Sequence, residues 1–149
     1  MARAIQLSID NVHSGGGPFG SVVVKNGAII AEGVNRVTAT NDPTAHAEVS
    51  AIRAACAHLG TFELTDCDLY TSCEPCPMCL GAIYWARVAH VYFGNLAADA
   101  AKIGFDDAFI YHEIAKPHAR RQIPTRQMMR EEALAAFREW EKKPNKIEY

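Results

Sequence analysis

The sequence predicts an α/β fold, a three-layer α/β/α sandwich around a mixed central sheet of about five strands. Two patterns predict it. Strand-like segments alternate with helix-spaced segments along the chain, in the order helix, hairpin, helix, strand, helix, strand, helix. The first two strands are joined by a tight turn and must be antiparallel, whereas helices separate the later strands and permit parallel crossovers.

Length and composition indicate one domain over residues 1–149, because 149 residues with 49% hydrophobic and 21% charged content can bury a substantial core. The net charge of -2 shows no basic surplus for a nucleic-acid backbone, so a small-molecule substrate is favoured. Three of the five cysteines lie within seven residues, which is typical of a reduced protein that binds metal through thiolates. Signal-peptide and membrane-spanning patterns are missing from the sequence, and we expect a cytoplasmic protein.

The N-terminal third predicts a helix over residues 2–13 and a hairpin. Asn26-Gly27 separates two β-branched runs, residues 21–25 and 28–32, and both turn residues tolerate positive φ. The glycine-rich run before the hairpin is either a plain loop or a pocket rim that carries Phe19. After the hairpin, Asn35 is either a turn residue or a hydrogen-bonding reader of a substrate edge.

The middle of the chain predicts two further helix–strand units. A helix should run over residues 46–58, with Asp42 or Thr44 as its cap, and a strand over residues 68–72 should follow. The next helix, from about residue 77 to 86, is apolar almost all round, which predicts burial on both sides. Its Trp85 is more typical of a core than of a pocket. A buried strand over residues 88–93 completes the unit.

Beyond residue 94 the pattern is weaker. Acids and aromatics mix in residues 104–111, where they either cap a short turn or supply a base-stacking ring and a second proton carrier. Residues 117–124 form a connection with a candidate edge strand. Apolar residues at helical spacing then predict a terminal helix over residues 128–142.

The chemistry of the chain centres on His46, Glu48, Cys76 and Cys79. Zinc binds imidazole and thiolate tetrahedrally, and a site with three protein ligands leaves the fourth position to water. A carboxylate beside that water can carry protons. Because His46 and Glu48 would lie about 200° apart on a regular helix, both can address one ion only at the first turn, where the N–H of Ala47 also points at the site.

A closed structural site is the alternative. Cys73, Cys76 and Cys79 are spaced three residues apart, so they could join His46 in a Cys3His site that does no chemistry. That site would leave Glu48 without a role. A helix beginning near Pro77 would also place Cys76 and Cys79 on one face and leave Cys73 on the strand side.

The motif H-x-E followed by P-C-x-x-C is the general signature of zinc nucleobase deaminases, and the chain resembles the cytidine deaminase superfamily, specifically its bacterial guanine deaminases. The resemblance runs from Gly17–Gly20 through the segments 41–48 and 70–87 to Gly104–Asp107 and Tyr149. The related tRNA adenosine deaminases share the zinc motif, but they lack the Phe-Asp-Asp segment and the closing tyrosine and are usually more basic.

The resemblance implies a cytidine deaminase-like fold and one Zn²⁺ per chain, held by His46, Cys76 and Cys79. Zinc-bound hydroxide would attack C2 of guanine while Glu48 shuttles a proton, giving xanthine and ammonia. Asp107 would help the amine leave. The substrate-binding residues implied or suggested by position are Asn35, Ala47, Phe19, Trp85, Phe105 and Tyr149.

The resemblance also implies a homodimer in which the C-terminal segment, about residues 115–149, crosses to the partner chain and its last tyrosine closes the partner's pocket. Two rival interpretations stay open at this point: a tRNA adenosine deaminase, and a non-catalytic scaffold in which Cys73 is the fourth zinc ligand. A third keeps the enzyme and changes the amine, because one extra group in a pocket can reverse such a preference.

Overall fold

The computed structural model describes residues 1–148 and divides into two compact units, Met1–Ala108 and Phe109–Tyr149. The first unit contains a sheet of four strands in the order β2-β1-β3-β4. The strands are β1 (Gly20–Lys25), β2 (Ala28–Val34), β3 (Cys67–Cys73) and β4 (His90–Asn95). β1 pairs antiparallel with both β2 and β3, whereas β3 and β4 are parallel. The mixed sheet predicted from the sequence is therefore confirmed.

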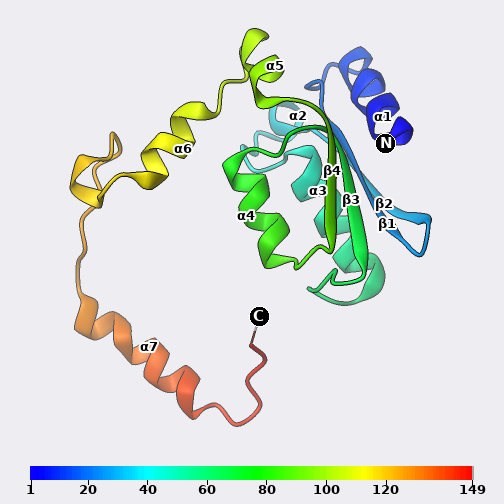
Figure 1. Ribbon diagram of the computed structural model, residues 1–149. Helices are drawn as coiled ribbons and strands as arrows, with labels where there is room; N and C mark the ends of the chain where they lie inside the picture. Colours follow the sequence, from blue (N-terminus) through cyan, green and yellow to red (C-terminus); the bar gives the residue numbers. More distant parts are fainter. Residues whose placement is uncertain (149) are drawn as a thin grey trace. The chain divides into compact units, whose positions relative to one another are not determined.

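Helices cover both faces of this sheet, as Figure 1 shows. An added Cβ on Gly20 would meet the backbone of α1 (Ala2–His13), whereas one on Gly33 would meet α3 (Ala47–Leu59). Gly33 pairs with Ser21, the neighbour of Gly20, so these two helices pack on opposite faces of the sheet. α4 (Pro77–Trp85) lies on the α3 side, and α2 (Val37–Thr40) and α5 (Ala97–Lys102) are short connecting helices.

The core lies between the sheet and the helices α3 and α4. It is formed by the small and branched residues Val23, Ala31, Ala51, Ile52, Ala55, Leu64, Cys67, Leu69, Ile83 and Ala86. The alanines on α3 allow that helix to approach the sheet closely, which fixes the position of its N-terminal end.

Local sequence signals place the turns correctly. Asn26 and Gly27 have φ values of 52° and 77°, so the hairpin turns where the Asn-Gly pair predicted. Gly60 has a φ of 66° and ends α3 in the left-handed conformation. The predicted cap of α3 was wrong. His46 is the N-cap, and the Asp42 carboxylate instead accepts hydrogen bonds from the backbone and hydroxyl of Thr44.

The sheet has four strands and not five in the described chain, because residues 117–124 do not pair with it. His118–Arg120 forms a 3-10 turn between two prolines, and proline cannot donate to a strand ladder. Strand β4 is therefore an edge strand, and most of its residues are exposed, contrary to the buried strand that the sequence predicted.

Helix α4 was predicted to be buried on both sides, and this was also wrong. Cys79 and Ile83 are its buried residues, whereas Trp85 is 66% exposed. The apolar run indicated a protected helix, but within one described chain only one side of it is covered.

The second unit is helical. It contains most of α6 (Ala108–Ala115), the 3-10 turn and α7 (Arg130–Lys142), close to the terminal helix predicted over residues 128–142. None of these three elements has a buried residue.

Candidate active site

The two helix N-termini of the first unit carry the candidate metal ligands. His46 is the N-cap of α3 and Cys76 is the N-cap of α4, and both have extended backbones. Pro77 follows Cys76 at the first position of α4, where its missing N–H has no intrahelical partner to lose. The free N–H groups of both helices give the site a positive potential, which stabilises thiolates.

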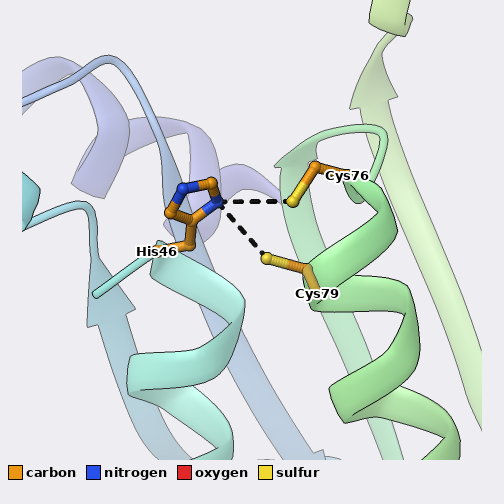
Figure 2. A group of neighbouring side chains, drawn as sticks. All are labelled: His46, Cys76 and Cys79. Atoms are coloured by element: carbon orange, nitrogen blue, oxygen red, sulfur yellow. Dashed lines mark hydrogen bonds between the residues drawn. The ribbon is translucent and has the colours of Figure 1, made fainter. Parts of the chain in front are cut away.

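His46, Cys76 and Cys79 converge on one point, as Figure 2 shows. The Nδ1 atom of His46 lies 3.5 Å from the Sγ atom of Cys76 and 3.5 Å from that of Cys79. All three candidate ligand atoms lie within 4.8 Å of one another. Zn–N and Zn–S bonds of about 2.1 and 2.3 Å at the tetrahedral angle separate N from S by about 3.6 Å. The spacing therefore fits one zinc ion.

The protonation of this cluster also fits a cation. A hydrogen bond from Cys79 and the neighbouring His46 imidazole lower the pKa of the Cys76 thiol to about 4. The pKa of Cys79 is raised, because its thiol donates that hydrogen bond and is buried. A thiolate beside an imidazole is a donor set that suits a zinc ion.

Glu48 lies beside the ligands in the first turn of α3 and is 6% exposed. Its Oε2 atom is 3.4 Å from the Sγ atom of Cys79, and its Oε1 atom accepts a hydrogen bond from the Thr71 hydroxyl at 3.1 Å. Burial raises the pKa of the Glu48 carboxyl. A carboxyl group beside the open metal position can accept and return a proton.

Cys73 is not part of the cluster among the described residues. Its thiol is directed to the backbone carbonyl of Leu96 at 3.8 Å, and burial raises its pKa to about 11. The geometry therefore favours the open three-ligand site over the closed Cys3His site.

Three of the predicted substrate-binding residues, Phe19, Asn35 and Phe105, are connected to one another, and Ala47 adjoins the candidate ligand His46. Asn35 is buried, and its backbone N–H donates to the carbonyl of Phe19 at 3.1 Å. The Phe19 ring meets the Phe105 ring edge to face at 5.0 Å between centroids. Ala47 is fully buried at the first position of α3, where its N–H has no intrahelical acceptor.

The remaining predicted site residues are Asp107, Trp85 and Tyr149. Asp107 is close to the ligands: burial and the nearby Cys76 thiolate raise its pKa. Trp85 lies at the other end of α4, about 9 Å along the helix from Cys79 at about 1.5 Å per residue. Tyr149 lies outside the described residues.

Thr71 was missed as a functional residue by sequence reasoning, although it stands in the strand that leads to the cysteine loop. It is 1% exposed and donates the hydrogen bond that holds Glu48, from a position 23 residues away in sequence. A hydroxyl residue inside a strand has no local signal for such a role. Only its inward position beside the motif could have indicated it.

A buried carboxylate beside a His-Cys-Cys zinc site at two helix N-termini defines the class of zinc hydrolases with an open metal position. Residues 1–95 match the family described as "Cytidine and deoxycytidylate deaminase zinc-binding region". The chain belongs to this family, and it is a zinc aminohydrolase.

Similarity to one relative extends over the whole chain. The guanine deaminase of Bacillus subtilis is 59% identical over 150 residues, covering 100% of this chain and 96% of the relative. The X-ray structure of a guanine deaminase from the same species has a TM-score of 0.97 and covers 99% of this chain and 95% of that one. The tRNA-specific adenosine deaminase of Agrobacterium fabrum is 48% identical over 77 residues, 52% of this chain and 51% of the relative.

Proposed function

We propose that the protein is a guanine deaminase, which hydrolyses guanine to xanthine and ammonia. Water adds its oxygen to C2 of the purine and the C2–N bond to the exocyclic amine breaks. One proton of the water goes to the ring nitrogen N3, and the other goes to the departing amine, which leaves as ammonia. The observation that carries this proposal is the 59% identity over the full chain. The match to the family ends at residue 95, but the similarity to this relative continues beyond it. Phe105 and Asp107 lie in that later part of the chain.

In this proposal Glu48 is the proton shuttle. His46, Cys76 and Cys79 would hold a zinc ion, which acts as a Lewis acid and lowers the pKa of a water molecule to about 7. The Glu48 carboxylate takes one proton from the attacking water and delivers it to the purine ring, and it then passes the second proton to the leaving amine. The raised pKa of the buried carboxyl supports this role, because a proton acceptor with a pKa closer to neutral also returns the proton easily.

The base is held by residues from four segments. Asn35 and the N–H of Ala47 read its polar edge, and Phe19 and Phe105 contact its faces. Asp107 contacts the exocyclic amine and assists its departure. The burial of Asn35 and the Phe19–Phe105 ring contact support these roles. Trp85 and Tyr149 are proposed to complete the pocket.

We further propose that the protein is a homodimer in which the C-terminal segment, about residues 115–149, is exchanged between chains. Phe137 of α7 is 68% exposed and Trp85 of α4 is 66% exposed, so each unit by itself leaves large apolar side chains in water. Exchange would cover such surfaces. The proposed location is the cytoplasm, because all five cysteines are free thiols. No helix among the described residues is long and apolar enough to cross a membrane.

A tRNA adenosine deaminase is the second candidate, favoured by the 48% identity to such an enzyme over half of this chain. The two candidates differ in their ligands. A tRNA deaminase binds a stem-loop with an affinity that falls steeply with salt, whereas a purine-base enzyme does not.

The test is an assay of ammonia release from guanine, adenine, cytosine, their nucleosides and a tRNA stem-loop, with zinc counted in the same sample. We expect about one zinc per chain and turnover of guanine. Release of ammonia only from a tRNA stem-loop would support the second candidate instead.

Glu48→Gln tests the mechanism. The amide cannot accept the proton of water, so guanine turnover should fall at least about 100-fold while zinc stays bound. Glu63→Gln is the matched control, because Glu63 lies in an exposed ion pair with Arg87. Turnover that survives in Glu48→Gln would remove the shuttle role from this residue.

A further inference from the structure

One asparagine of α1 connects two of the segments that carry proposed base-binding residues, the loop before β1 and the end of β2. The Nδ2 atom of Asn11 donates to the carbonyl of Gly17 at 2.7 Å and to the carbonyl of Asn35 at 2.8 Å. The residue is 9% exposed. Because the amide NH₂ has two hydrogens, both of its donors are used in holding these carbonyls.

These two hydrogen bonds close a small network. Asn35 donates its backbone N–H to Phe19, so its peptide groups are held on both sides, by Phe19 and by Asn11. Its side-chain Oδ1 atom accepts from the N–H of Val37 at 3.3 Å. The Oδ1 end of the Asn35 amide is thus held by a backbone partner, and its own peptide groups are held by Phe19 and Asn11.

The glycines of the loop fit closely around the two asparagines. A Cβ on Gly16 would lie 2.4 Å from the Nδ2 atom of Asn11, and one on Gly17 would lie 3.1 Å from the Cγ atom of Asn35. Such distances exclude any side chain at Gly16 unless the Asn11 amide moves. The glycine-rich run, which the sequence left as either a loop or a pocket rim, is therefore shaped by these amides.

The network continues to the aromatic rings. Phe19 follows Gly17 by two residues, and its ring contacts Phe105 edge to face at 5.0 Å. A shift of the Gly17 carbonyl would therefore displace the ring pair relative to Asn35. Ser8, on the same buried face of α1, differs: its hydroxyl donates to the carbonyl of Ile5 within the helix.

We propose that Asn11 is a positioning residue for purine binding: it sets the separation between Asn35 and the Phe19–Phe105 ring pair, and so determines affinity for the base. This inference rests on the proposed function of the site. The side-chain hydrogen bonds of Asn11 go to Gly17 and Asn35, and within the described residues none goes to Glu48 or to a zinc ligand. Its effect should therefore be on binding of the base and not on the chemical step.

The test compares Asn11→Asp with Ser8→Ala, each as the full-length zinc-loaded protein. Aspartate has the shape of asparagine but neither donor, and it would face two carbonyls. We expect the KM for guanine to rise about tenfold or more, the Kd of 8-azaguanine to rise in parallel, and kcat and zinc content to stay within about twofold. Ser8→Ala should match the wild type in all four quantities.

Gly16→Ala is the second variant, because its methyl group would push the Asn11 amide aside without changing α1. Gly16→Ala should also raise the KM for guanine, and it keeps the inference testable if Asn11→Asp does not fold. A folded Asn11→Asp or Gly16→Ala protein with an unchanged KM, or with a loss confined to kcat, would overturn the inference. A wild type that releases no ammonia from guanine would overturn the proposed function and this inference with it.

Discussion

At the scale of single residues, three equally spaced cysteines have different chemistry. Cys76 and Cys79 face His46, and the pKa of Cys76 falls to about 4. Cys73 ends strand β3, points to a backbone carbonyl, and has a pKa of about 11. The ligand atoms of His46, Cys76 and Cys79 lie within 4.8 Å of one another, whereas Cys73 is not part of that cluster among the described residues. The chain changes from strand to helix between Cys73 and Cys76, and this change directs the Cys73 thiol away from the candidate ligands.

Cys73→Ser should therefore keep about one zinc per chain, measured by atomic absorption after dialysis. Cys76→Ser is the matched comparison, and it should lose most of its metal because one of three ligands is removed. Loss of zinc in both variants to the same extent would favour the closed Cys3His site.

Thr71 offers a second test at this scale, because its hydroxyl holds the Glu48 carboxylate at 3.1 Å. Thr71→Val keeps the shape of the side chain and removes the hydrogen bond, so kcat for guanine should fall about tenfold, as one buried bond to a charged group predicts. Thr71→Ser keeps the hydroxyl and should retain most of the rate. Equal rates in the two variants would show that the hydroxyl does not position Glu48.

Sequence reasoning predicted the His-Cys-Cys cluster that the structure contains, because its residues stand at fixed spacings in two short motifs. It did not find Asn11 or Thr71. Their partners lie 24 and 23 residues away, and the hydrogen bonds exist only after the sheet brings those segments together. A lone polar residue in a helix or strand gives no indication of such a partner.

At the scale of elements, the approach of α3 to β2 depends on a missing side chain. A Cβ on Gly33 would lie 2.2 Å from the carbonyl of Ala47 and 2.5 Å from the nitrogen of Ala51, both backbone atoms of α3. Backbone cannot rotate away as a side chain can, so the helix would have to shift. Because α3 begins at His46, such a shift would also move a zinc ligand.

Gly33→Ala should destabilise the protein by about 1–3 kcal/mol, as overpacking of a close contact does, and should weaken zinc binding. Thermal unfolding and competition with a chelator measure the two effects. Gly81→Ala is the control: nothing lies within 4 Å of an added Cβ there, and alanine favours the helix. A Gly33→Ala protein as stable as wild type would mean that α3 does not need this close contact.

The elements with strong local signals were predicted, including the hairpin at Asn26-Gly27 and the helix that ends at Gly60. The exposure of α4 and β4 was not predicted. An apolar pattern indicates that a surface is favourably buried, but it does not indicate whether the same chain buries it. The same limit produced the fifth strand, which no segment of the described chain supplies.

At the scale of the whole molecule, the two units differ in how they can be stable. The first unit has a buried core, whereas the helices of the second bury no residue fully. A helical segment with exposed Phe137, Met128 and Ile123 gains little by folding alone. It needs an apolar surface to pack on, and the proposed exchange would supply one from a second chain.

Exchange predicts a specific result when two defective chains are mixed. Deleting Tyr149 should lower kcat/KM for guanine about tenfold or more, as loss of one buried aromatic contact does, with zinc and fold retained.

A Glu48→Gln chain is inactive for a different reason. If Tyr149 closes the partner's pocket, a mixed dimer has one site with an intact Glu48 and an intact tyrosine from the other chain. Unfolding and refolding the two variants together should therefore restore turnover above the sum of the two separately refolded proteins. Activity equal to that sum would mean that each chain closes its own site.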